Sequence, residues 1–470
     1  MADRILLGGA PEGYDARLLG RELARGQSVI HIARDDRRMA AMKTALTVLS
    51  PGVVVLDFPA WDCLPYDRVS PNPEISAQRM ATLAALASGL AAPFILLTTL
   101  NAATQRIPAR AVLETASFAA QVGDRVDEAR LKRFLANMGF TPVSTVSEPG
   151  DYALRGGIVD IFPPGRGGPV RLDFFGDTLD GIRRFDAATQ RTTQKLTSVE
   201  FAPMSEVLLD EAAIARFRQN YRVEFGAGGS DDPLYEAVSA GRKHQGMEHW
   251  LPFFHARLET IFDYLPAASV MLDDQITAAR LSRWEGIEDQ YDARHGAMSA
   301  KGRIDTVYKP SAPDLLYLSD AAWEAALASH RVVQLSPLSQ APGPGVLDAG
   351  GRIGRSFAPE RQQENVSLFG ALADYLHVEL KSGQVVIASY SEGARERLKG
   401  LLDDQKVRNI KVIKDFREVP DGRGALFLMV WGLEAGFGAP GLTVISEQDV
   451  LGERMVGKPR RKRKADNFLR

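Results

Sequence analysis

The sequence predicts an α/β protein in which a parallel-sheet domain is interrupted by an inserted α+β domain with an antiparallel sheet, and is followed by a separate small α/β domain. Three observations lead to this fold class. The chain opens with a strand, a glycine-rich loop and a helix; strand and helix alternation gives way to an antiparallel meander after residue 116; and alternation resumes after a Pro- and Gly-rich stretch. The expected parts are the parallel-sheet domain at 1–116 and 201–335, the inserted domain at 117–200, a linker at 336–354, the small domain at 355–455, and a basic tail or linker at 456–470.

The first element is an apolar strand at Ile5–Leu7, which leads into the loop Gly8–Gly13 and a helix over Ala16–Leu23. The loop has the glycine spacing of the phosphate-binding motif G-x-x-x-x-G-K-[ST], which predicts a helicase-like P-loop domain. Tyr14 stands where the phosphate-binding Lys belongs, and Asp15 stands where the Mg²⁺-binding Ser or Thr belongs. We therefore expect a degenerate nucleotide site, no ATPase activity in this chain and no cofactor.

The remaining elements of the first domain follow from short β-branched runs and apolar periodicity. The predicted strands are 27–33, 53–58, 261–266 and 269–272, and the predicted helices include 35–49 and 211–220.

The inserted domain should present one face of its sheet to solvent. Alternation along Val170–Phe175 puts Arg171 and Phe175 on the outward face. An outward Phe beside an Arg is typical of a binding hot spot. The structural alternative is that Phe175 covers its own domain while Arg171 pairs with Asp173 or Asp177. The predicted elements are a helix at 127–138 and strands at 158–162, 170–175 and 178–185.

The small domain shows no catalytic constellation, because His377, Glu379 and Asp374 share one predicted helix with no nucleophile or metal partner. The stretch 458–464 carries six positive charges in seven positions and is interpreted as a solvated segment, with nucleic-acid contact as the alternative. The predicted helices are 368–380 and 392–404, and the predicted strands are 384–389, 409–413, 425–430 and 441–446.

Bulk composition limits the possible functions. A net charge of −2 gives no global attraction to nucleic acid or membranes. The lone cysteine, Cys63, excludes an internal disulfide and is expected to be a buried, inert thiol. The start of the chain lacks a signal-peptide pattern, and the apolar region 81–97 is broken by Ser, Gly and Pro. We expect a cytoplasmic protein with no membrane partner.

Four blocks resemble the UvrB family, and in particular the UvrB-like module at the N-terminus of the bacterial transcription-repair coupling factors (the Mfd family). They are Phe58–Asp67, Arg155–Pro163, Arg171–Phe175 and Ile261–Pro266, in the order of the family. The resemblance covers nearly the whole chain. It implies participation in transcription-coupled nucleotide excision repair.

The resemblance also implies which residues act. Positions through which the family binds UvrA fall on Arg155, Arg171 and Phe175. Asp273 and Asp274 stand where the ATPases of the family hold Mg²⁺ and activate water, and we interpret them as a relic. In full-length relatives, RNA polymerase and double-stranded DNA are bound by modules whose motifs this chain lacks.

Three hypotheses follow. The first is an ATPase-dead binding module that recruits UvrA to stalled transcription. The second is a UvrB-like, ATP-dependent DNA-handling enzyme, which the residues Tyr14 and Asp15 disfavour. The third is a stand-alone regulator that competes with UvrB for UvrA.

Overall fold

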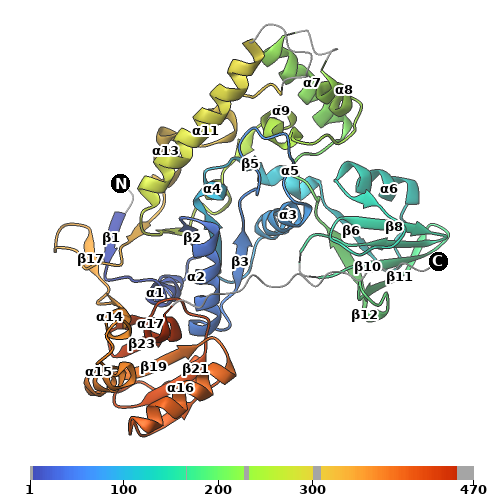
Figure 1. The fold of residues 1–470 in the computed structure, drawn as a ribbon. Coiled ribbons are helices and arrows are strands. Elements are labelled where there is room, and N and C mark those ends of the chain that lie inside the picture. The colour runs from blue at the N-terminus through green and yellow to red at the C-terminus, as the bar shows by residue number, and fades with distance from the viewer. Residues whose placement is uncertain (1–3, 166, 227–231, 300–307, 453–470) are drawn as a thin grey trace, which may run out of the picture. The chain divides into compact units, whose positions relative to one another are not determined.

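A computed structural model describes residues 4–165, 167–226, 232–299 and 308–452, which form two compact units (Figure 1). Of the described residues, those within 4–5, 21–40 and 53–334 form the first unit, and those within 6–20, 41–52 and 335–452 form the second. The structure contains a parallel sheet together with antiparallel and mixed sheets. The predicted α/β class is thereby confirmed.

The first unit is built on a parallel sheet with strands in the order β16-β15-β2-β4-β3. The central strands β2, β15 and β4 are buried at every residue, as expected of a parallel sheet covered on both faces. The elements of this layer are β2 (Val29–Ala33), α2 (Asp36–Leu49), β3 (Val55–Phe58), α3 (Pro73–Ser88), β4 (Ile95–Thr99), α4 (Leu100–Ala103), α10 (Ile261–Tyr264), β15 (Ser269–Leu272), α11 (Ile276–Ser299), α13 (Asp320–Leu327) and β16 (Val332–Leu335).

The expectation of a strand at 261–266 is wrong. Residues Ile261–Tyr264 form the short helix α10, because Thr260 and Asp263 make a capping box in which each side chain accepts a hydrogen bond from the other residue's backbone N–H. The apolar run there is buried as a helix, with Ile261 and Tyr264 each 1% exposed. Burial alone cannot separate a short buried helix from a short buried strand.

A helical layer in the same unit encloses an aromatic core that contains Phe217, Tyr221 and Trp250, each fully buried. Its packing is close: the rings of Phe217 and Phe254 stack with centroids 4.8 Å apart. The elements are α7 (Glu211–Phe225), α8 (Pro233–Ser239), η2 (Met247–Trp250), α9 (Leu251–Phe254) and α12 (Pro313–Leu316), with the small pair β5 (Ile107–Pro108) and β14 (Leu258–Glu259) and the helix α5 (Arg110–Thr115).

The inserted domain is a six-stranded sheet, in the order β12-β11-β10-β9-β8-β7, with α6 packed on one face (Figure 1). Asp127 caps α6 by accepting the N–H of Ala129. The elements are α6 (Glu128–Asn137), β7 (Thr141–Pro142), β8 (Asp151–Arg155), β9 (Ile158–Ile161), β10 (Val170–Phe175), β11 (Thr178–Phe185) and β12 (Thr192–Leu196).

The two segments that connect this domain to the rest of the first unit pair with each other. Strand β6 (Phe118–Gln121) runs antiparallel to β13 (Ser198–Phe201), and the paired rings of Phe118 and Phe201 stack at 5.8 Å and 9°. Met204 and Leu208 belong to the same core. The core of the inserted domain therefore extends beyond residue 200.

The second unit holds a six-stranded sheet in the order β18-β22-β23-β19-β21-β20, covered by α15 and α16 (Figure 1). Two strands, β17 and β18, lie in the stretch expected to be a linker, and β17 pairs in parallel with β1. The elements are β1 (Arg4–Gly8), α1 (Tyr14–Leu23), β17 (Val346–Asp348), β18 (Arg352–Ile353), α14 (Ala358–Arg361), α15 (Leu368–Ser382), β19 (Gln384–Ser389), α16 (Glu392–Asp404), β20 (Ile410–Val412), η3 (Phe416–Glu418), β21 (Leu426–Val430), β22 (Phe437–Ala439), β23 (Leu442–Ser446) and α17 (Glu447–Leu451).

We predict that residues 117–209 fold alone, because β6 and β13 close the domain at its two chain crossings. A thermal melt of this fragment, followed by circular dichroism, should show one cooperative transition. A fragment ending at residue 197 lacks β13, Phe201, Met204 and Leu208, and should melt broadly. Equal cooperativity of the two fragments would contradict the role assigned to the β6–β13 closure.

Candidate functional site

The outer face of the six-stranded sheet carries Arg171 and Phe175. The other residues of β10 follow the predicted alternation: Val170 and Leu172 are buried and Phe174 packs against the core. The sequence pattern thus assigns the two faces of this strand correctly.

Arg171 is held by an ion pair across the sheet. Its Nε and Nη2 donate to the two carboxylate oxygens of Asp160 on β9, at 2.7 and 2.8 Å. The guanidinium also lies 4.8 Å from the ring centre of Phe185. These hydrogen bonds are the main reason that the pKa of Arg171 is raised above its usual value. The structural alternative is right that Arg171 pairs within its own sheet but wrong about the partner, because Asp160, and not Asp173 or Asp177, is its directly opposed neighbour.

Phe175 is the most exposed large apolar side chain in the described part of the chain, with 83% of its surface in water. It is the last residue of β10 and pairs with Thr178 across a two-residue turn in which Gly176 has a φ of 65°. The prediction that Phe175 points outward is confirmed. The alternative that it covers its own domain is wrong.

Arg155 lies on the same face. Gly156 and Gly157 form a two-residue hairpin loop with φ of 45° and 81°, which keeps the register so that Arg155 lies opposite Ile158. Ile158 in turn lies opposite Asp173, the residue between Arg171 and Phe175 on the outward face. Cross-strand partners share a face, so the structure brings all three predicted residues together there.

The two hairpin tips are joined directly, because the N–H of Phe174 donates to the carbonyl of Gly157 at 2.7 Å. Arg155 donates through Nη2 to the carbonyl of Ser144 and to Thr145 Oγ1, the latter at 3.1 Å. The exposed Arg and Phe therefore project from a connected edge rather than from separate loops.

Sequence reasoning missed the charges that organise this face. Asp160 was not singled out, and neither was Arg183, whose guanidinium donates to both oxygens of Asp173 at 2.6 and 2.8 Å. A signal was present in the sequence. Opposite charges stand at alternate positions on neighbouring strands, and such residues can pair once the register is known.

Metal-ligand clusters and reactive thiols are two other kinds of chemical site. In the described residues, no group of three His, Cys, Asp or Glu side chains is placed to hold a metal ion. Cys63 is a half-buried free thiol, and burial is the main cause that raises its pKa to about 12, which opposes formation of a nucleophilic thiolate.

The glycine loop at the start of the chain is filled by its own side chains. Tyr14 is fully buried, donates from its hydroxyl to the carbonyl of Ala349 at 3.1 Å, and stacks on Phe437. Asp15 is 2% exposed and accepts the N–H of Gly13 at 3.0 Å. A carboxylate thus takes a backbone donor that in an intact loop of this kind would serve a phosphate.

The chain also packs closely over this loop. A Cβ on Gly351 would lie 2.5 Å from the carbonyl oxygen of Gly9 and 2.6 Å from the ring of Tyr14. A Cβ on Gly9 would lie 2.4 Å from a carboxylate oxygen of Asp348. Gly8, the first glycine of the loop, pairs with Asp348 through the β1–β17 ladder.

Asp273 is neutralised by arginines. Its carboxylate accepts from Arg38 Nε at 3.2 Å and from Arg34 Nη1 at 3.3 Å, and both Asp273 and Arg38 are buried. Asp274 is the next residue and is half-buried. The basic stretch 458–464, the other candidate for contact with nucleic acid, lies outside the described residues.

Comparison with known proteins identifies two parts of the chain. Residues 118–206 match the UvrB interaction domain family, and residues 377–450 match the MFD D3 domain family. The transcription-repair-coupling factor of Haemophilus influenzae is 29% identical over 472 residues, which is 99% of this chain. That of Escherichia coli is 30% identical over 88% of this chain.

The chain belongs to the transcription-repair-coupling factor family. It spans 40% of the Haemophilus influenzae relative and 35% of the Escherichia coli relative. All three outward residues fall inside the region that matches the UvrB interaction domain. Within the described ranges, no helix of this family member is long and apolar enough to cross a membrane.

We predict that Asp160→Asn destabilises the protein by about 1–3 kcal/mol, since it leaves a partly buried guanidinium without its carboxylate. Denaturant unfolding measures the change. The matched control is Asp177→Asn, whose carboxylate lies 3.9 Å from Arg125 with both side chains exposed, so its loss should be close to zero. Equal losses in the two variants would show that the Arg171–Asp160 pair does not stabilise the sheet.

Proposed function

We propose that this chain recruits UvrA in transcription-coupled nucleotide excision repair, using the outer face of the sheet in its inserted domain. Two findings support the proposal. The chain belongs to the transcription-repair-coupling factor family, and the face lies in the region that matches the UvrB interaction domain.

The observation that carries the proposal is the 83% exposure of Phe175 on a braced strand. A large aromatic side chain left in water has a cost that packing within its own domain would remove. Here the neighbouring Arg171 is fixed by Asp160 and the strand is held on both sides, so Phe175 is presented with little freedom to turn inward. A preorganised aromatic anchor loses little entropy when a partner covers it.

Arginine and phenylalanine make complementary contributions to such a contact. Asp160 occupies Nε and Nη2 of Arg171, which leaves the N–H groups of Nη1 for an acceptor on UvrA. Arg155 adds a second planar fork at the neighbouring hairpin tip. We propose that these three residues form the centre of the contact.

We infer further that this chain hydrolyses no ATP. Support comes from the buried Tyr14 in the position of the phosphate-binding Lys, from the Asp15 carboxylate in the loop, and from Arg34 and Arg38 beside Asp273. A phosphate would meet a like charge in the loop, and a Mg²⁺ ion would have to displace two arginines.

We predict that Phe175→Ala weakens UvrA binding by about 2 kcal/mol, roughly thirtyfold in Kd, without changing stability. Arg155→Ala should also weaken it, whereas Arg171→Ala should reduce both binding and stability because Asp160 loses its partner. Titration calorimetry with purified UvrA gives the affinities, and denaturant unfolding gives the stabilities.

Two matched controls come from exposed residues outside the face. Val223 is 79% exposed on α7, and Arg133 is exposed on α6, which packs on the opposite face of the sheet in the inserted domain. Val223→Ala and Arg133→Ala should bind UvrA like the wild type. Unchanged affinity of Phe175→Ala and Arg155→Ala would refute the site, and no binding by the wild type would refute the function.

We predict that the double variant Tyr14→Lys and Asp15→Thr gains no ATP turnover. It restores two side chains of the motif, but the close packing of Gly351 on Gly9 and the arginines beside Asp273 are unchanged. A fluorescent ATP analogue titrated in Mg²⁺ tests binding, and phosphate release tests turnover. Phosphate release by the double variant would contradict the prediction, and saturable micromolar binding to the wild type would contradict the assignment of a degenerate nucleotide site.

A further inference from the structure

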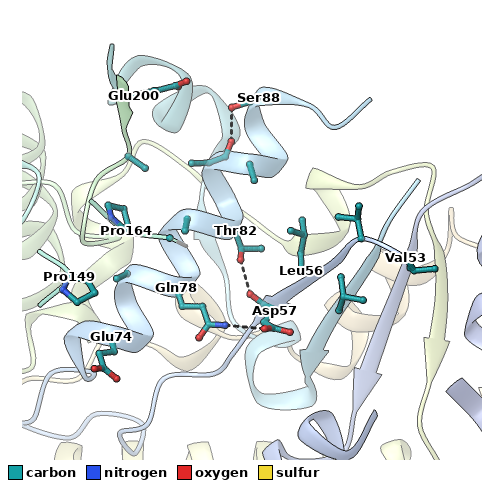
Figure 2. A pocket seen from close by; sticks show the side chains of 18 residues that line it. Val53, Leu56, Asp57, Glu74, Gln78, Thr82, Ser88, Pro149, Pro164 and Glu200 are labelled. Carbon is teal, nitrogen blue, oxygen red and sulfur yellow. Dashed lines mark hydrogen bonds between the residues drawn. The ribbon is translucent and has the colours of Figure 1, made fainter. Parts of the chain in front are cut away.

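A second surface of the first unit is a groove of about 840 Å³ beside strand β3 (Figure 2). One wall is the segment Val53–Asp57, another is helix α3, and the loops around Pro149 and Pro164 close it from the inserted domain. Figure 2 shows Gln78 and Thr82 of α3 directed toward Asp57. This groove has no part in the face that carries Phe175.

Strand β3 is the edge of its sheet. It pairs with β4 on one side, and no strand of the described residues pairs with its other side. The N–H of Ile95 donates to the carbonyl of Val54, so Val54 and Leu56 turn their backbone groups toward β4. Val55 and Asp57 turn theirs outward, as the alternation of a parallel ladder requires.

At the far end of that edge helix α3 holds Asp57: the hydroxyl of Thr82 donates to the carbonyl of Asp57 at 2.7 Å. Toward the start of the strand the side chains become more accessible, and Val54 is 47% exposed. An apolar edge with outward backbone donors and acceptors is a template for an added strand.

Helix α3 leaves space for such a strand, because its groove side carries small residues. Ala81, Ala84, Ala85 and Ser88 line the cavity. The helix is fixed in place by the fully buried Arg79, whose Nε and Nη2 donate to the carboxylate of Glu206 at 2.5 and 3.1 Å. The groove is therefore preformed.

The charged side chains that line the groove are all acidic. Asp57, Glu74 and Glu200 line it, and no Lys or Arg does so in the parts of the chain that the structure describes. Glu74 and Glu200 are exposed. A cationic partner is favoured by this arrangement, and the phosphate backbone of a nucleic acid is opposed by it.

We propose that this groove binds an extended, Lys- or Arg-containing segment of a partner protein, which adds as a strand to the free edge of β3. Backbone hydrogen bonds to the outward N–H and carbonyl of Val55 supply the pairing. Alternate side chains of the segment lie over the alanines of α3, and the basic ones meet the carboxylates. The segment is accommodated at a surface separate from the UvrA-binding face.

The test uses the full 470-residue chain and a fluorescein-labelled six-residue peptide in which Lys and Val alternate. Fluorescence anisotropy should show saturable binding. A second peptide of the same sequence, methylated on alternate backbone nitrogens, cannot complete a strand ladder and should bind at least about tenfold more weakly. Equal affinity of the two peptides would overturn the added-strand geometry.

Variants of the protein locate the peptide. Glu74→Lys with Glu200→Lys should weaken binding about tenfold or more, whereas Glu285→Lys with Glu288→Lys, an equal charge change at exposed positions of α11 outside the groove, should change it far less. Val55→Pro removes an outward donor from the edge and leaves the bonds to β4 intact, so it too should weaken binding.

Three outcomes would overturn the proposal: no binding of the unmethylated peptide, equal weakening by the two charge-changed proteins, or unchanged affinity of both the Val55→Pro and the Glu74→Lys with Glu200→Lys proteins. Analytical sedimentation of the wild type tests whether a second copy of this chain occupies the groove instead. Concentration-dependent dimers that Val55→Pro abolishes would assign the β3 edge to a second copy of this chain and reject a heterologous segment.

Discussion

The ion pair between Arg171 and Asp160 is the constraint on which the proposed binding face depends. It joins β10 to β9 with two short hydrogen bonds on the face of the sheet that carries Phe175, while the opposite face of both strands packs on the core. The ion pair directs the arginine toward Asp160 and Phe185, and Phe175, four residues later, stays in water.

In the glycine loop Gly8–Gly13 a carboxylate also fixes the local structure, but there the neighbouring side chain fills a space instead of being left exposed. There a carboxylate, Asp15, satisfies a backbone donor inside the chain, and Tyr14 fills the adjoining space. Asp273, which stands where the family resemblance places a Mg²⁺ ligand, is likewise bound by Arg34 and Arg38. The glycine loop thus satisfies its own polar groups, whereas the face around Phe175 leaves a large apolar side chain exposed, and this contrast supports the proposed division between a degenerate nucleotide site and a partner-binding face.

The sequence predicted much of the fold because its signals are local. Alternation assigned the two faces of β10, and glycine placement located both hairpin turns beside Arg155 and Phe175. Asp160 escaped notice because its pairing with Arg171 depends on strand register, which a single strand does not encode. The helix at Ile261–Tyr264 was misassigned because its apolar run is too short to show a period, and the capping pair Thr260 and Asp263 was the better signal. The close approach of Gly351 to Gly9 joins segments some 340 positions apart and has no local signature.

The most direct test of the account is hydrogen–deuterium exchange of the 470-residue chain with and without UvrA. The account predicts slowed exchange in the two joined hairpins that contain Arg155 and Phe175, namely β8–β9 and β10–β11, with no change around the loop Gly8–Gly13. UvrA-dependent protection confined to segments outside residues 151–185, with these hairpins unchanged, would contradict it.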